Sequence, residues 1–102
     1  MEIRIYEKAK ETLQKVDQKT FLRLKKALHE LELKGCDSSN VKKLQGISKG
    51  FRKRVGRWRI LFVQDASVIH VYIIGMEKGK KDYSKWCAYI SERAFVLEYK
   101  HP

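Results

Sequence analysis

The spacing of the apolar residues changes in the middle of this chain, and the change limits the folds that the chain can form. Over residues 7–34 apolar side chains recur every three or four positions, which places them on one face of a helix. Over residues 51–75 they alternate with polar side chains, which is the period of a β-strand. The sequence therefore predicts an α+β fold, in which helices pack on a mostly antiparallel sheet.

The helical part predicts a short strand and then a helical hairpin. Residues 1–6 alternate apolar and charged side chains, which is typical of an edge strand. The capping residues Asp17 and Thr20 separate two apolar stripes and so divide two helices. Gly35 is expected to end the second helix in a left-handed conformation. The stripes are Tyr6, Ala9, Leu13 and Val16, then Phe21, Leu24, Leu28 and Leu31.

The alternating part predicts an antiparallel sheet. We read residues 36–50 as loop and linker, and we expect tight hairpin turns at Gly56-Arg57 and at Asp65-Ala66. These turns join three expected strands near residues 51–55, 57–64 and 67–75.

The C-terminal part predicts one more helix. It is expected over residues 80–93, and residues 94–99 are expected to form a last strand or part of an ordered tail that reaches residue 102. A chain of 102 residues is long enough for one core and too short for two independent ones, so we expect a single domain over residues 1–102. The apolar face of the last helix consists of Tyr83, Trp86, Cys87 and Ile90.

The charge of the chain points to a polyanionic partner. Its formal net charge is +11, which favours nucleic acid, an acidic protein or an anionic membrane. The membrane is the weakest of the three, because the apolar runs are only as long as strands and the N-terminus lacks the apolar core of a signal peptide. We therefore expect a soluble, cytoplasmic protein. Cys36 and Cys87 have no metal-binding spacing, so we expect two reduced thiols, no metal site and no cofactor.

The stretch FRKRVGRWRI at residues 51–60 concentrates five cations, and no carboxylate occurs from Ser38 to Gln64. A two-residue turn at Gly56-Arg57 pairs Arg54 with Arg59, a like-charge pair that costs some tenths of a kcal/mol. Alternation then places Arg52, Arg54 and Arg59 on one face of the sheet. The opposite face, which is the expected floor for the helical hairpin, carries Phe51, Val55, Trp58, Ile60 and Phe62.

The second turn extends this register. With Asp65-Ala66 as the loop, Phe62 pairs with Ile69, Ile60 with Val71, Leu61 with His70, and Arg59 with Tyr72, so that His70 and Tyr72 join the arginine face. The arginines then either form an anion pocket that grips phosphate oxygens, or are solvated, or pair with distant carboxylates. The carboxylates considered are Glu77, Asp82 and Glu92.

Several of these segments together resemble a known family. The run VKKLQG, then FRKRVGRWRILF, then an apolar strand ending in IIG, then a basic segment reaching DYSK is similar to the RelE/ParE superfamily of toxins from bacterial and archaeal toxin–antitoxin pairs. The resemblance covers about residues 1–90. It implies a compact fold like that of microbial ribonucleases, with the site on a curved antiparallel sheet. It also implies either cleavage of mRNA on the ribosome or, in the ParE branch, inhibition of DNA gyrase.

The resemblance also assigns site residues. Arg52 and Arg54 match the two basic positions of the first hairpin strand, Arg59 matches the arginine of the second, and Tyr83 matches the tyrosine that closes the basic loop. Glu77 stands where some members have an arginine, which leaves three lysines of this loop as candidates for that role. They are Lys78, Lys80 and Lys81, and Lys80 is our choice for the catalytic set.

RNA cleavage of this type needs no metal if the 2′-hydroxyl of the substrate attacks the adjacent phosphorus. A base must accept the 2′ proton, cations must neutralise the phosphorane, and an acid must protonate the leaving oxygen. We expect Tyr83 to be the base, the three arginines to neutralise charge, and a loop lysine to be the acid. Further RNA contacts are expected from Lys43, Lys49, Lys53, Arg57, Lys78 and Lys81.

Other readings stay open for individual residues. Tyr83 is either catalytic or packed in the core beside Trp86, and His70 is either a proton carrier or a packed, hydrogen-bonded histidine. His29 is expected on the exposed flank of the second helix, and His101 in the tail.

The sequence thus favours a ribosome-dependent mRNA endonuclease toxin, with the ribosome, mRNA and a cognate antitoxin as partners. Two alternatives remain: a gyrase inhibitor like ParE, without chemistry, and a member of the fold that only binds RNA.

Overall fold

The computed structural model describes the backbone of residues 1–77 and 80–100 and the side chains of residues 1–77 and 83–93. The elements along the chain are β1 (Glu2–Ile5), α1 (Glu7–Lys15), α2 (Gln18–Lys34), the 3₁₀ turn η1 (Gly35–Asp37), β2 (Val41–Lys43), β3 (Gly50–Val55), β4 (Trp58–Asp65), β5 (Val68–Met76) and α3 (Lys80–Lys100).

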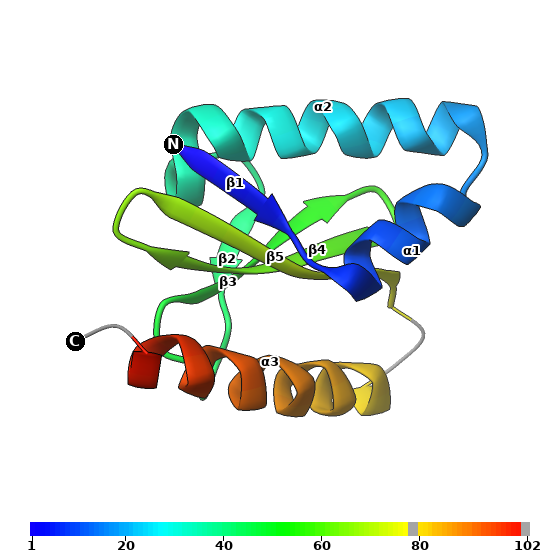
Figure 1. Ribbon diagram of the computed structural model, residues 1–102. Helices are drawn as coiled ribbons and strands as arrows, with labels where there is room; N and C mark the ends of the chain where they lie inside the picture. The colour runs from blue at the N-terminus through cyan, green and yellow to red at the C-terminus, as the bar shows by residue number, and fades with distance from the viewer. Residues whose placement is uncertain (78–79, 101–102) are drawn as a thin grey trace.

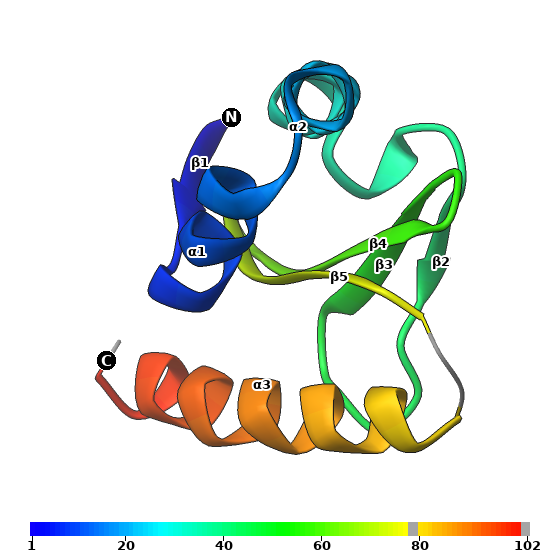
Figure 2. The ribbon, with the colours of Figure 1, turned by 90° about the vertical axis from the view of Figure 1, so that its right-hand side faces the viewer.

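The elements form three layers, with the sheet in the middle (Figures 1 and 2). The strand order is β1-β5-β4-β3-β2. The β1–β5 pair is parallel and the other three pairs are antiparallel. In Figure 2 α2 lies above the sheet and α3 below it, with α1 near β1. The expected α+β fold, with a helical hairpin on a mostly antiparallel sheet, is confirmed.

The ends of α2 follow the sequence signals. The backbone N–H of Thr20 donates to the Asp17 carboxylate at 2.9 Å, which caps the first turn. Hydrogen bonding to the side chain of Thr20, followed by this backbone bond, holds the pKa of Asp17 below its usual value. Gly35 ends the helix with a φ of 57°. Its ψ of −136° departs from the left-handed helical region that we expected. A Cβ here would lie 2.6 Å from Gln64 Oε1, so both the φ and the space favour glycine.

The helical hairpin and one face of the sheet enclose the first core. Each large aliphatic side chain that is fully buried in such a core contributes about 1.5–3 kcal/mol. All five residues predicted as the floor, Phe51, Val55, Trp58, Ile60 and Phe62, lie in this core or against it. Its buried members are Ala9, Leu24, Ala27, Leu28, Leu31, Ile60, Phe62, Ile69, Val71 and Ile74.

The register predicted between β4 and β5 is wrong. Asp65 pairs with Val68, so the loop is Ala66-Ser67, and Ala66 takes the positive φ of 54° that the turn needs. A bulge then leaves Tyr72 without a ladder partner, since Phe62 pairs with Val71 and Leu61 with Ile73. The expected pairs Phe62–Ile69, Ile60–Val71, Leu61–His70 and Arg59–Tyr72 are replaced, and Ile60 pairs with Ile74 and Arg59 with Gly75.

The faces predicted for His70 and Tyr72 nevertheless hold. Moving the loop by one residue shifts each partner by two residues, so that His70 pairs with Val63 in place of Leu61 and stays on the same face. The bulge places Tyr72 on the same face as Ile73. His70 is 2% exposed and shares a hydrogen bond of 2.7 Å between Nδ1 and the Tyr6 hydroxyl. The packed, hydrogen-bonded reading of His70 is therefore confirmed.

The second core lies between the sheet and α3. Tyr83, Trp86, Cys87 and Ile90 face it, as predicted. Trp86 fits against β5 because Gly75 has no side chain: a Cβ there would lie 2.7 Å from Trp86 Cζ2. The buried members of this core are Leu44, Ile47, Leu61, Val63, Tyr72, Ile73 and Ile90.

Two elements differ from the sequence reading. Strand β2 lies inside the segment that we read as linker, and pairs with β3 at the sheet edge. Helix α3 continues to Lys100, so residues 94–99 are helical and the last-strand alternative is wrong. His101 lies outside the described residues.

Candidate active site

Three arginines from neighbouring strands converge on one pocket. Arg54 pairs with Arg59 across β3 and β4, and Arg52 is the next residue on the same face. These pairings are the ones predicted from the Gly56-Arg57 turn. The pocket has a volume of about 500 Å³ and is lined by Asn40, Val41, Lys42, Arg52, Arg54, Arg59 and Glu77. We call it the arginine pocket.

Strand β2 adds a cation that the sequence reading missed. Lys42 pairs with Arg52, so its side chain lies on the arginine face, while Val41 packs against the first core. The alternation of Val41 and Lys42 is the signal that could have revealed this strand. It was overlooked because β2 has only three residues.

Arg59 is held firmly in place. Its Nη1 donates to the carbonyl oxygens of Gly56 at 2.9 Å and Trp58 at 3.0 Å. Its Nη2 lies 3.2 Å from Glu77 Oε2, and its side chain is only 16% exposed. Since a guanidinium has five N–H donors, these contacts leave about two for a substrate. Arg59 is therefore the fixed cation of the pocket, and the pairing with Glu77 considered from the sequence is present.

Arg52 lies over an aromatic ring. Its Cζ is 5.3 Å from the centroid of Tyr83, which meets Trp86 edge to face at 5.6 Å. The Tyr83 hydroxyl is buried and has no hydrogen-bond partner among the described residues. Tyr83 thus supports Arg52 from below, and its oxygen would have to become exposed before it could act as a base.

Arg54 is the most open of the three arginines. It lines the arginine pocket and two adjoining hollows, one toward α2 and one toward the hairpin turn. In the described part of the chain, no carboxylate forms an ion pair with Arg52 or Arg54. The alternative partner Glu92 lies beside Arg93 at 3.7 Å, and the side chain of Asp82 is outside the described residues.

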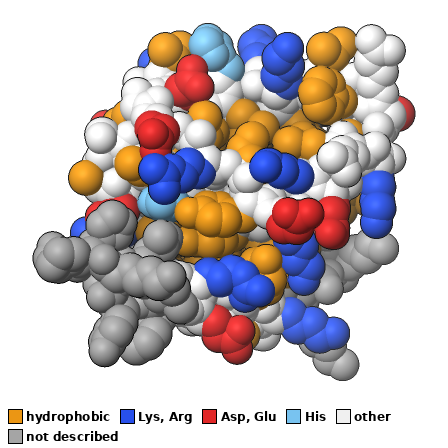
Figure 3. Space-filling view, in the orientation of Figure 1, with side chains coloured by type: hydrophobic (Ala, Val, Ile, Leu, Met, Phe, Trp, Pro, Cys, Tyr) orange, Lys and Arg blue, Asp and Glu red, His pale blue; other side chains and the backbone are white. Residues whose placement is uncertain are grey.

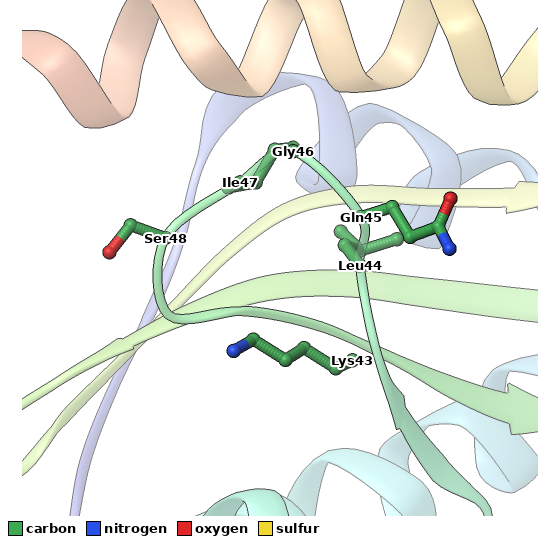
Figure 4. A pocket seen from close by; sticks show the side chains of 6 residues that line it. All are labelled: Lys43, Leu44, Gln45, Gly46, Ile47 and Ser48. Carbon is green, nitrogen blue, oxygen red and sulfur yellow. The ribbon is translucent and has the colours of Figure 1, made fainter.

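The other predicted RNA-binding cations are dispersed. Arg57 is exposed in the hairpin turn, next to Arg54 and Arg59. Lys43 is the last residue of β2 and, with the β2–β3 loop that follows it, lines a separate hollow. This loop arches toward α3 (Figure 4). Lys49 is exposed and lies 3.4 Å from Asp65. Lys78 and the side chains of Lys80 and Lys81 lie outside the described residues.

Lys53 is not available to RNA. It pairs with Ile60 on the helical-hairpin face and is 2% exposed. Its ammonium donates to Glu30 at 3.0 Å, to Ser38 Oγ at 2.6 Å and to the carbonyl of Ser39 at 2.7 Å. The hydrogen bond from Lys53, followed by its charge, holds the pKa of Glu30 below its usual value. Including Lys53 among the RNA contacts was wrong, because period-two alternation turns it away from the arginines.

The charge of the arginine pocket contrasts with the face seen in Figure 3. On the face seen in Figure 3, acidic and basic side chains are interspersed around apolar patches. In the pocket, by contrast, four cations face one carboxylate among the described residues. Such an excess of fixed positive charge favours a phosphate group.

The described residues offer neither a metal cluster nor a membrane-spanning helix. No group of three or more His, Cys, Asp and Glu side chains there could hold a metal ion. No helix in that part is both long and apolar enough to cross a membrane. Cys36 and Cys87 are free thiols, and burial raises the pKa of the Cys87 thiol. His29 is exposed, as expected, beside Glu32.

The fold matches solved structures. No family model and no curated protein matches the sequence. The isolated RelE toxin of E. coli superposes with a TM-score of 0.65 at 20% identity, covering 87% of this chain and 97% of that one. A chain of the archaeal RelE–RelB complex from Pyrococcus horikoshii gives 0.66 at 20% identity, covering 78% and 96%.

A third match comes from a different toxin. A chain of the YoeB–YefM complex from Staphylococcus aureus gives a TM-score of 0.63 at 15% identity, covering 76% of this chain and 97% of that one. The chain therefore has the RelE-like fold. It spans nearly the full length of each of these solved chains.

Proposed function

We propose that this protein is the toxin of a type II toxin–antitoxin system and that it cleaves mRNA on the ribosome without a metal ion. The observation that supports this most is the convergence of Arg52, Arg54 and Arg59 from two adjacent strands on one pocket of a RelE-like fold. A phosphodiester is the group whose charge and oxygen geometry fit paired guanidinium groups.

The arginines would act on the phosphate. Arg52 and Arg54 grip the non-bridging oxygens of the scissile phosphate, because both are without a carboxylate partner in the described structure. Arg59, anchored by two carbonyl oxygens, holds its charge in place as the phosphorane forms. A preorganised donor of this kind contributes about 10²–10³ in rate.

The remaining roles are assigned by position along the chain. Lys80, with Lys78 and Lys81 beside it, comes at the start of α3 and would protonate the leaving 5′-oxygen. Tyr83 supports Arg52 and is the base expected from the sequence. Lys42, Lys43, Lys49 and Arg57 would contact RNA outside the scissile phosphate.

The partners follow from this activity. The ribosome and mRNA are the substrate complex, which places the reaction in the cytoplasm. A cognate antitoxin is expected to bind the toxin, as in the complexes of RelE with RelB and of YoeB with YefM. An acidic segment would complement the positive charge of this chain.

A translation extract tests the proposal. Added protein should produce cuts in the message at the ribosomal A site, each leaving a 5′-hydroxyl on the downstream fragment. An uncut message together with blocked DNA supercoiling would instead support a ParE-like gyrase inhibitor. RNA binding without either effect would support a member of the fold that only binds RNA.

A further inference from the structure

The arginine pocket contains one proton acceptor that these assignments leave unused. Glu77 is the only carboxylate among the described residues that line it. It also lines the adjoining hollow beside Arg54 and Arg57. A carboxylate weakens phosphate binding in the same pocket because like charges repel, so it must have a role that offsets this cost. Holding Arg59 in place is one such role, and accepting a proton is another.

Glu77 is held at the edge of the phosphate site. Its Oε2 lies 3.2 Å from Arg59 Nη2, and Arg59 is itself fixed by two backbone carbonyls. The Glu77 side chain is 33% exposed, so it faces the pocket and solvent. A carboxylate accepts several hydrogen bonds, and the contact with Arg59 leaves room for a hydroxyl. A phosphate bound by Arg59 therefore places its own ribose near Glu77.

The other candidate bases are less accessible. The hydroxyl of Tyr83 is buried, and a phenol has an ordinary pKa of about 10. His70 is 2% exposed and shares a hydrogen bond with Tyr6. Among the described residues, Glu77 is thus the proton acceptor that opens into the arginine pocket.

We propose that Glu77 is the general base of the cleavage reaction; this inference rests on the function proposed above. The Glu77 carboxylate takes the proton of the 2′-hydroxyl as that oxygen forms a bond to phosphorus. The bond from phosphorus to the 5′-oxygen then breaks, and the leaving oxygen takes a proton from a lysine ammonium at the start of α3. The products are a 2′,3′-cyclic phosphate and a 5′-hydroxyl, and Glu77 returns its proton to solvent.

The test is the single-turnover cleavage of mRNA on programmed ribosomes by Glu77→Gln, over a range of pH. Loss of the base should slow the rate at saturating protein by about 100-fold or more. Binding should stay as tight or tighter, because a negative charge has been removed from a phosphate site. The rate of the wild type should fall at acidic pH, and the variant should lack that fall. Glu77→Asp should restore part of the rate.

Several charged side chains lie around Glu77 and could affect how the cleavage rate depends on pH. Lys42 on β2, Arg52 and Arg54 on β3, and Arg59 on β4 face the same pocket, with Arg57 in the adjoining hollow. None of these cations loses its charge in the acidic range, so they do not produce an acidic limb. The matched control is Glu2→Gln, which removes the same charge and a 2.7 Å ion pair with Arg4 at the far edge of the sheet.

The outcomes separate the two proposals. If Glu77→Gln cuts as fast as the wild type, or retains the acidic limb, Glu77 is not the base and merely occupies the phosphate site of Arg59. If the wild type leaves the message uncut, the proposed function fails, and this inference fails with it. Equal thermal unfolding of the wild type and the variant shows that a lost rate reflects chemistry.

Discussion

Arg54 combines a cost to folding with a proposed benefit to function. It faces Arg59 directly, and a like-charge pair of this kind destabilises a sheet by some tenths of a kcal/mol. A side chain that binds a phosphate must be accessible to it. Arg54 is exposed and lines three adjoining hollows. On the proposed function, the pair gives up stability in return for phosphate binding.

Arg54→Thr tests whether Arg54 lowers the stability of the fold while it promotes cleavage. Cleavage on the ribosome should fall by about 10²–10³, whereas the free energy of unfolding should stay level or rise slightly because the repulsion is relieved. Urea unfolding and single-turnover cleavage measure the two effects. Arg4→Thr, at an exposed position on β1, is the matched control and should leave cleavage intact. A large loss of stability in Arg54→Thr would mean that Arg54 supports the fold.

Unlike the exposed Arg54, Lys53 is a buried cation with three oxygen partners. Lys53→Met keeps the aliphatic volume but leaves Ser38 Oγ and the carbonyl of Ser39 without their donor. Unfolding by urea should show a loss of about 1–3 kcal/mol. Lys49→Met, which removes an exposed pair with Asp65, should change stability by less than about 0.5 kcal/mol. Similar losses in both variants would contradict the buried network.

The same network predicts a dependence on pH. The pKa of Glu30 is lowered in the folded state by Lys53, so the unfolded state binds a proton more readily. The stabilisation is therefore present above the unfolded pKa and is lost as pH falls through the folded one. The difference in stability between the wild type and Glu30→Gln should shrink on acidification below about pH 4.3. A difference that is constant with pH would exclude this linkage.

At the scale of elements, the contact between β5 and α3 positions the aromatic support of Arg52. Gly75 lets Trp86 lie against the strand, and Trp86 in turn meets Tyr83. The bulge at Tyr72 makes this possible, because it shifts the register so that Gly75 stands opposite Arg59. A short-range feature of β5 thus decides how α3 sits beside the pocket.

Gly75→Ala should disturb this contact. Its Cβ would lie 2.7 Å from Trp86 Cζ2, and overpacking of this kind costs about 1–3 kcal/mol. In a Trp86→Leu background the same change should cost clearly less, because the ring that it meets is gone. A double-mutant cycle in urea measures the difference. Equal costs in both backgrounds would show that the contact does not limit the approach of α3.

At the scale of the whole molecule, a net charge of +11 makes binding to RNA depend on salt. Fluorescence anisotropy with single-stranded RNA should give a linear plot of log affinity against log salt. Lys42→Gln should reduce the slope by about 0.7, the value for one phosphate contact on a single strand. Lys10→Gln, on α1 away from β2, should reduce it less. An unchanged slope in Lys42→Gln would remove β2 from the proposed RNA path.

The features that the sequence determined by itself are local ones: the type and order of most elements, and the face of the sheet that carries the arginines. The helical and strand periods gave the order of most elements, and the Gly56-Arg57 turn placed the three arginines on one face. This was possible because a two-residue turn and a period of two leave only one arrangement of neighbouring side chains.

Tertiary structure alone decided the rest. The burial of Lys53 among Glu30, Ser38 and Ser39 and the placement of Glu77 against Arg59 join segments that are distant along the chain. The β4–β5 register depends on a bulge at Tyr72 inside the paired strands. No local period carries that information, because each depends on how the helices and a bulged strand pack in three dimensions.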